Sequence, residues 1–223
     1  MDIILAIETS TAHGTVALYE VGKPLEVIEF SSDRSHNAVI FEPLQRLLKA
    51  GLPDLIVVGT GPGSYSGIRV GIAAGLGISL AHGVPLIGLS SLTALGEAYA
   101  LERYAITGNA RRGSWWYAEV TGGGLSLPPI VEDEPSIAAR TSQWPGLLFT
   151  LDTSSPPFCT AHPVRPRADV LASRAGKIPE SALTRLAAIE TEPLYLRAPF
   201  ITVSKKQGLA SPGPAVPPGV HGL

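Results

Sequence analysis

The residues that could do chemistry gather at two places in the first third of the chain. A short apolar run over residues 3–9 ends in a carboxylate and a hydroxyl, groups that can hold a metal-bound phosphate at the end of a sheet strand. A glycine-rich loop over residues 59–67 precedes a predicted helix, and backbone N–H groups at a helix N-terminus attract anions. The competing interpretation is a tight turn that brings the helix close to the sheet, which is the commoner use of short glycine motifs. The candidates for a vestigial anion loop are Glu8, Thr9, Gly61, Gly63 and Ser64.

Other kinds of catalytic or metal site find no support in the sequence. The loop lacks the Lys-Ser/Thr pair of a P-loop, and neither Ser64 nor Ser66 has the Gly-x-Ser-x-Gly setting of a nucleophile elbow. The five histidines are dispersed without a zinc-binding spacing. Cys159 is the only cysteine, so neither a cysteine zinc site nor a disulfide within the chain can form. We therefore predict no catalytic residue and no metal site.

The helix predicted after the loop, over about residues 66–82, is apolar on nearly every side. An interior glycine costs a helix about 0.5–1 kcal/mol relative to alanine, so its aligned glycines need a reason, and close approach by another helix supplies one. A helix that is apolar all round must also be covered all round. We predict that a second protein contributes to this cover; packing wholly inside the chain is the alternative. The stripe of small side chains comprises Gly67, Gly71, Gly75 and Ser79, and the parallel apolar stripe comprises Ile68, Ile72, Leu76 and Leu80.

Alternating and continuous apolar runs predict the elements that position these residues. Three strands follow one another through short turns, as in an antiparallel meander. A helix with Ser35 as N-cap and Gly51 as its end comes next, and Pro43 should bend it or mark its restart. Alternating strands and helices follow, which predicts a mixed sheet with helices on its faces. The predicted strands are 3–9, 14–20, 25–31, 54–59 and 85–89, and the helices after them include 66–82 and 90–102.

The second half of the chain repeats this pattern more faintly. We therefore predict an α/β protein of two similar lobes, each a mixed sheet with helices, with the second lobe reduced. The first lobe spans residues 1–103 and the second spans residues 104–203, whereas residues 204–223, rich in proline and glycine, are predicted to be a disordered tail. The elements expected in the second half are strands over 104–108, 114–121, 125–131 and 147–151, and helices over about 167–175 and 180–190.

Composition limits the function of the chain. Its net charge of −2 and scattered basic residues argue against a protein that binds nucleic acid on its own, because neutralising the phosphates needs a basic face. The single cysteine fits a reducing compartment, and the acidic N-terminus lacks the basic region of a signal peptide. The long uncharged stretch after residue 69 is interrupted at residues 82–85, before it reaches the length of a membrane span. We expect a cytoplasmic protein with no membrane contact.

Four segments, in their order and approximate spacing, resemble the TsaB (YeaZ-like) family of tRNA threonylcarbamoyladenosine biosynthesis proteins. The block over residues 57–95 is the longest and most specific, and the resemblance runs from residue 3 to about residue 200. It implies two actin-like (ribonuclease H-like) lobes of the actin/Hsp70/sugar-kinase-like superfamily, in agreement with the order of the elements. The four segments are ILAIETSTAHGTVALYE, VVGTGPGSYSGIRVGIAAGLGISLAHGVPLIGLSSLTAL, NARRGSWWYAEV and PLYLRAP.

The resemblance implies a scaffold or activating subunit that is not itself an enzyme. By this resemblance the chain binds the catalytic subunit TsaD, the ATPase TsaE joins them, and the complex transfers threonylcarbamoyl to N6 of the tRNA adenosine next to the anticodon. Helices at about 36–50 and 66–82 would form the TsaD-binding face, or a homodimer face when the partner is missing. The chain alone would bind no cofactor, since the complex uses ATP and ADP, and it would meet tRNA only through the complex. The residues assigned to this face are Gly67, Ile68, Gly71, Gly75, Ser79, His36 and Ile40.

The chain departs from its catalytic relatives at two places. With Gly88 laid on the glycine that precedes the metal-binding HxxxH motif of TsaD, Ser91 and Leu95 stand at the two histidine positions, so the older glycoprotease label of the family finds no support. Where kinase-like relatives carry a second glycine-rich phosphate loop, residues 151–157 contain no glycine. The main alternative function is an ATP-dependent small-molecule kinase on the same fold. A hydrolase is a further alternative, but no residues have the spacing of a catalytic triad. A scaffold that acts outside tRNA modification is another, and only the identity of its partner would distinguish it from the function implied by the resemblance.

Overall fold

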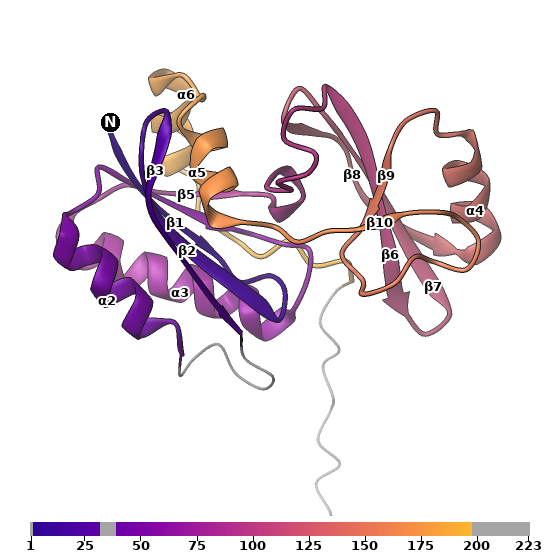
Figure 1. Cartoon of the computed structure of the whole chain (residues 1–223), viewed down its shortest axis with the longest axis horizontal. Helices are drawn as coiled ribbons and strands as arrows, with labels where there is room; N and C mark the ends of the chain where they lie inside the picture. Colours follow the sequence, from indigo (N-terminus) through magenta and orange to yellow (C-terminus); the bar gives the residue numbers. More distant parts are fainter. Residues whose placement is uncertain (1, 32–38, 198–223) are drawn as a thin grey trace, which may run out of the picture.

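Two five-stranded sheets lie side by side along the long axis of the computed structural model, which describes residues 2–31 and 39–197 (Figure 1). The first sheet has the strand order β3-β2-β1-β4-β5, and the second has the order β8-β7-β6-β9-β10. In each, the first strand along the chain is central, with an antiparallel meander on one side and parallel strands on the other. The predicted duplication of a mixed α/β lobe is confirmed.

The first sheet brings the candidate polar residues together at one edge. Its parallel strands β1, β4 and β5 end at the same side, so Glu8 and Gly59 become neighbours although they lie far apart in sequence. The strands of this sheet are β1 (Ile3–Glu8), β2 (His13–Glu20), β3 (Lys23–Ser31), β4 (Leu55–Gly59) and β5 (Leu86–Leu89).

Helices cover both faces of the first sheet. Helices α2 (Phe41–Ala50) and α3 (Tyr65–His82) pack on one face, where alternate side chains such as Leu5 of β1 point. The neighbouring side chain, Ile4, points to the opposite face, which is covered by residues 168–186 from much later in the chain. Pro43 falls in the first turn of α2, as expected for a restarted helix; Ser35 and the start of the predicted helix lie outside the described residues.

The predicted extent of the second lobe needs a correction. Helices α5 (Ala168–Ala175) and α6 (Glu180–Ala187), both assigned to residues 104–203, pack on the first sheet instead (Figure 1). The uncovered apolar face of β1, β2 and β4 has to be buried, and these helices supply the buried side chains. The chain therefore returns to the first lobe after leaving it, which local sequence patterns do not reveal.

The second sheet is thinner and differently covered. Helix α4 (Glu134–Gln143) packs on one face through Ile137, and the segment 91–101 that joins the lobes packs on the other. The last two strands have only three and two residues, which agrees with a reduced lobe. The strands of this sheet are β6 (Arg103–Arg111), β7 (Ser114–Thr121), β8 (Gly124–Asp133), β9 (Leu148–Thr150) and β10 (His162–Pro163).

The helix predicted over residues 90–102 is wrong. Ser90 caps a turn by accepting a hydrogen bond from Leu92 N, but only a 3-10 turn, η1 (Ser91–Thr93), forms. Beyond it, Ala94 O accepts a hydrogen bond from Arg167 N at 2.9 Å, and Leu95 bridges to Pro166. Tertiary backbone hydrogen bonds to the returning chain have replaced those of a helix.

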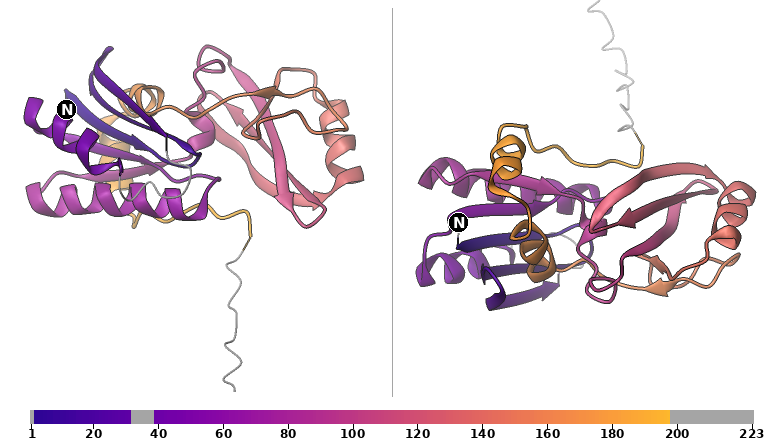
Figure 2. Two further views of the ribbon diagram at one scale, coloured as in Figure 1. Left: turned by 60° about the horizontal axis from the view of Figure 1, so that its bottom comes forward. Right: turned by 90° about the horizontal axis from the view of Figure 1, so that it is seen from above.

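The segment over residues 188–197, which forms no helix or strand, follows α6 and runs back toward the second lobe (Figure 2). Leu194 N donates to Thr60 O at 2.7 Å, the ring of Tyr195 stacks on Tyr65 with centroids 5.0 Å apart, and Leu196 packs against the core of the second lobe. Within the described ranges, no helix is long and apolar enough to cross a membrane.

Candidate functional site

The glycine-rich loop turns its backbone donors toward its own chain. Gly61 N donates to Ser91 Oγ at 3.0 Å, and Ser64 N donates to Ser10 O at 2.7 Å. Ser64 Oγ caps α3 by accepting a hydrogen bond from Gly67 N at 3.2 Å. Donors that already have an acceptor within the fold offer little to a phosphate. The geometry corresponds to the tight-turn interpretation of this loop.

Glu8 is buried beneath the same loop. Its side chain is 1% exposed, Oε1 accepts a hydrogen bond from Ser10 N at 2.7 Å, and Oε2 has no hydrogen-bond partner. Burial raises the pKa of this carboxyl, and the hydrogen bonds from Ser10 oppose that shift only in part. A Cβ at Gly59 would lie 1.9 Å from Oε2, so the carboxyl is held against the β4 backbone. The carboxyl is therefore enclosed between Ser10 and the end of β4, with one oxygen unpaired.

Helix α3 turns its glycines inward. A Cβ at Gly71 would lie 2.3 Å from Thr9 Oγ1, and a Cβ at Gly75 would lie 2.7 Å from Val58 Cγ1. Thr9 Oγ1 also donates to Gly67 O at 2.8 Å. These residues let the helix approach its own sheet, because any larger side chain would push the two apart. The prediction that another helix approaches these glycines is wrong, and the alternative holds: they pack on the sheet of the same chain.

The assignment of this stripe to a partner-binding face is therefore corrected. Ser79 is half-buried and donates through Oγ to Val84 O at 2.6 Å, which holds the end of the helix. His36 lies outside the described residues. The residues of the predicted face that are buried inside the fold are Gly67, Ile68, Gly71, Gly75 and Ile40.

The opposite side of α3 is apolar and exposed. Leu80 is 77% exposed and Leu76 is 46% exposed, and Phe41 at the start of α2 is 61% exposed. Between the two helices lies a groove of about 680 Å³ whose floor is made of small and apolar side chains. Its lining residues are Phe41, Arg69, Val70, Ala73, Ala74, Gly77, Ile78, Ala81 and His82. Exposed apolar patches of this kind are found at protein interaction sites and ligand-binding grooves.

Periodicity alone did not locate this surface. The predicted apolar stripe mixes Ile68, which is 1% exposed, with Leu76 and Leu80, which face outward. Because α3 is apolar on both sides, the sequence pattern has no polar face to orient it. The identity of the inner side follows only from what the sheet presents to it.

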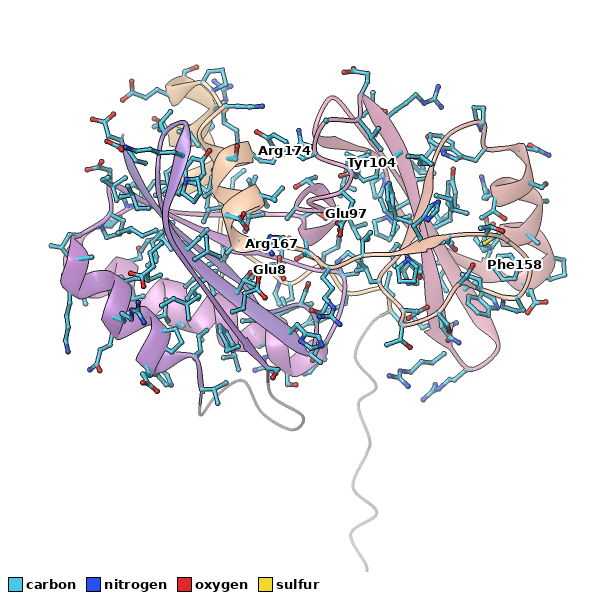
Figure 3. The ribbon with its side chains drawn as sticks, in the orientation of Figure 1. Glu8, Glu97, Tyr104, Phe158, Arg167 and Arg174 are labelled. Atoms are coloured by element: carbon cyan, nitrogen blue, oxygen red, sulfur yellow. The ribbon has the colours of Figure 1, made fainter. Side chains whose placement is uncertain are left out.

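A second cavity of about 740 Å³ lies between the two lobes. Arg167 faces it and is already paired, since its guanidinium donates to Glu29 Oε1 at 2.8 Å and to Asp169 Oδ1 at 3.0 Å. Where a second phosphate loop would stand, Asp152 lines the cavity and accepts a hydrogen bond from Asn109 N. Figure 3 shows Arg167 near the middle of the molecule between the two sheets. The wall of the cavity carries both signs of charge, with the carboxylates of Glu29, Glu97 and Asp152 beside the guanidinium groups of Arg165 and Arg167.

Metal-binding geometry is lacking in the described part of the chain. No group of three His, Cys, Asp or Glu side chains there could hold a metal ion. Ser91 accepts a hydrogen bond from Gly61 N, and Leu95 is fully buried. The two positions matched to histidines are thus held by residues that make packing and hydrogen-bond contacts within the fold. The aromatic rings of Trp116 and Tyr117 in β7 are buried in the two cores of the second lobe.

The two repeated sheets define the class of protein. Each lobe has the mixed five-stranded sheet of the actin-like, ribonuclease H-like α/β fold. The structure of YeaZ from Pseudomonas aeruginosa superimposes with a TM-score of 0.66 over 88% of this chain and 100% of that chain, at 25% sequence identity. A second Pseudomonas aeruginosa structure, described as similar to peptidase YeaZ, gives a TM-score of 0.68 at 25% identity with the same coverage.

Sequence comparisons point to the same relatives. The tRNA threonylcarbamoyladenosine biosynthesis protein TsaB of Buchnera aphidicola is 31% identical over 127 residues, which cover 53% of this chain and 60% of that protein. The protein of the same name from Escherichia coli is 32% identical over 125 residues, covering 52% and 54%. Residues 31–141 match the family described as TsaD, tRNA N6-adenosine threonylcarbamoyltransferase. The chain is therefore similar to TsaB and YeaZ proteins, and the matched segments span about half the length of these curated relatives.

Proposed function

We propose that this protein is a non-catalytic subunit of the machinery that makes threonylcarbamoyladenosine in tRNA. In this proposal it binds the catalytic threonylcarbamoyltransferase, TsaD, and TsaE joins the pair. The names of its TsaB relatives and the TsaD family match over residues 31–141 support this role. Contact with tRNA would come through the complex, since the chain has a net charge of −2.

The exposed apolar face of α2 and α3 is the observation that carries the proposal. Leu80 and Phe41 would be costly to leave in water, and the groove between the helices offers a complementary surface to an apolar helix. Because this face lies opposite the glycine stripe, the partner would touch Leu76 and Leu80 instead of Gly71. A second copy of the chain is the expected occupant when the partner is missing.

The polar residues support a role without catalysis. Glu8 is buried, and Gly61 N and Ser64 N in the glycine-rich loop donate within the fold, so this junction presents no nucleophile, base and oxyanion donors around a common point. The proposal therefore places the chemistry in the partner, where ATP or ADP would also be used.

Size-exclusion chromatography with light scattering tests the proposal. The purified chain, mixed with TsaD from the same organism, should elute as a 1:1 species. Leu80→Asp should abolish that species, because it places a charge in an apolar contact. The matched control is Leu147→Asp, an exposed leucine of the second lobe, which should leave the complex intact. Separate elution of the two unmodified proteins, with and without nucleotide and TsaE, would contradict the proposal.

A kinase-like enzyme is the second candidate, and the interlobe cavity is its support. Its volume of about 740 Å³ falls within the range of small-molecule sites. Titration calorimetry of the isolated chain with ATP and Mg²⁺ separates the two functions. Saturable binding that is lost in Arg167→Ala would favour the kinase, whereas no heat of binding is expected for the scaffold.

A further inference from the structure

Helix α5 packs on the first lobe, but the side chain of Arg174 in its last turn reaches a segment that packs with the second lobe. Arg174 Nε donates to Thr93 O at 3.2 Å, and Nη2 donates to Tyr99 O at 3.2 Å. Both carbonyls belong to the segment 91–101, whose apolar side chains, Leu95 among them, lie in the core of the second lobe. The guanidinium of Arg174 therefore joins the two lobes through two hydrogen bonds.

The ring of Tyr99 adds to this junction. The guanidinium carbon of Arg174 lies 4.5 Å from the ring centroid and Lys177 Nζ lies 4.6 Å from it, both within range for a cation–π attraction. The phenol oxygen of Tyr99 is hydrogen-bonded to Ser173 Oγ. Three side chains in and just after the last turn of α5 thus hold one aromatic ring. A change in the angle between the lobes would have to break these contacts together.

Two further observations place Arg174 against the second lobe itself. Burial raises the pKa of Tyr104, a core residue of that lobe, to about 12, and the positive charge of Arg174 opposes part of the rise. A Cβ at Gly123, in the turn between β7 and β8, would lie 2.6 Å from Arg174 Nη1, so the turn leaves the space that the guanidinium occupies. Figure 3 shows Arg174 on the side of α5 that faces the second lobe.

The same helix borders the cavity between the lobes. Arg167, at the N-terminal end of α5, lines the cavity of about 740 Å³. Arg174 lies seven positions further on, which is about 10 Å along a helix. Domains joined by a few chain segments move relative to each other unless a contact restrains them. A contact at one end of α5 can therefore set the width of the cavity at the other end.

We propose that Arg174 and Tyr99 form a latch that fixes the angle between the two lobes and so holds the interlobe cavity at its observed width. Within the described ranges, the buried apolar side chains of the two lobes belong to separate clusters, which leaves this restraint to contacts at the boundary. The latch is a property of the isolated chain, and it holds whether or not TsaD is the partner.

Pulsed electron paramagnetic resonance measures the width of the cavity directly. Spin labels at His13→Cys and Thr153→Cys lie in its wall, one in each lobe, and Cys159→Ser removes the native thiol. Arg174→Met keeps the length of the side chain but removes its charge and its donors, so it should shift and broaden the distance distribution. The matched control, Arg185→Met, removes an exposed arginine of α6 and should leave the distribution unchanged. Equal distributions in all three proteins, or equal broadening in the control, would overturn the inference.

Tyr99→Leu tests the same contact from the other side. It should broaden the distribution as Arg174→Met does, and the double variant should be no broader than either single variant, because all three lose one contact. Tyr99→Leu also decides the question if circular dichroism shows that Arg174→Met does not fold. A double variant whose broadening equals the sum of the two single effects would show that the residues act separately, and the latch would be wrong.

Discussion

The two sides of helix α3 have opposite requirements although their composition is alike. On the inner side, Gly71 approaches Thr9 so closely that a single added carbon would collide with it. On the outer side, Gly77 has open space around its Cα, and Leu80 stands mostly in solvent. Small residues inside therefore determine how the helix packs, whereas large residues outside are free to bind something else. One helix can serve the fold and a partner because these tasks fall on different sides.

The largest effect is expected on the inner side, from Gly71→Leu. The new side chain would separate α3 from the sheet and break the hydrogen bond from Thr9 Oγ1 to Gly67 O, at a cost of about 3 kcal/mol or more. Urea denaturation should report the loss, together with reduced soluble yield. If the variant keeps its stability and loses only partner binding, the glycine stripe is a partner-binding surface, and the proposed difference between the two sides of α3 is wrong.

Glu8→Gln should give a smaller effect that depends on pH. Burial raises the pKa of Glu8 above its usual value of 4.5, so the unfolded chain releases this proton before the folded chain does. The free energy of unfolding of the unmodified protein should therefore decline as pH rises from about 4.5 toward the raised pKa. The variant, which resembles the protonated acid, lacks this decline. Urea denaturation of both proteins at several pH values measures the difference in their free energies of unfolding, which should widen as pH rises; a difference that stays constant with pH would contradict the prediction.

Gly77→Ala should change stability in the opposite direction from Gly71→Leu. An ideal Cβ at Gly77 meets no atom within 4 Å, and alanine in a helix interior is favoured over glycine by about 0.5–1 kcal/mol. Thermal unfolding should show a rise in Tm of a few degrees. A fall in Tm would mean that the outer side is packed more closely in solution than the structure gives.

The smallest effect on stability is expected from Leu80→Asp. The side chain is 77% exposed, so its replacement should change the free energy of unfolding by about 0.5 kcal/mol or less. Urea denaturation and circular dichroism provide the measurement. Loss of TsaD binding at unchanged stability would separate the two sides of α3; a large destabilisation would mean that Leu80 belongs to the core.

Local sequence signals predicted most strands and failed where distant chain segments meet. The three-strand meanders and α3 were predicted because alternation, glycine turns and helical spacing act over a few residues. Helix α4 was missed although Asp133 caps it by accepting from Ser136 N and Pro135 lies in its first turn, both recognisable start signals. The helix expected over residues 90–102 failed because the returning chain near Pro166 competes for its backbone.

The candidate site was predicted in kind but not in orientation. The sequence indicated that α3 needs cover on all sides and that its glycines permit close approach. It could not say that the sheet takes the side with Gly71, leaving Leu80 and Phe41 outside. The buried state of Glu8 was equally hidden, since it depends on Gly59, a residue 51 positions away.

The sequence by itself determined the class of fold, the order of the strands and the apolar character of α3, because propensity and periodicity are properties of neighbouring residues. Only the tertiary structure decided which face of α3 is buried, which lobe α5 and α6 join, and that Gly61 N and Ser64 N of the glycine-rich loop donate within the chain. Those outcomes depend on contacts between segments far apart in the sequence, such as Gly71 with Thr9, and local sequence patterns carry no information about such contacts.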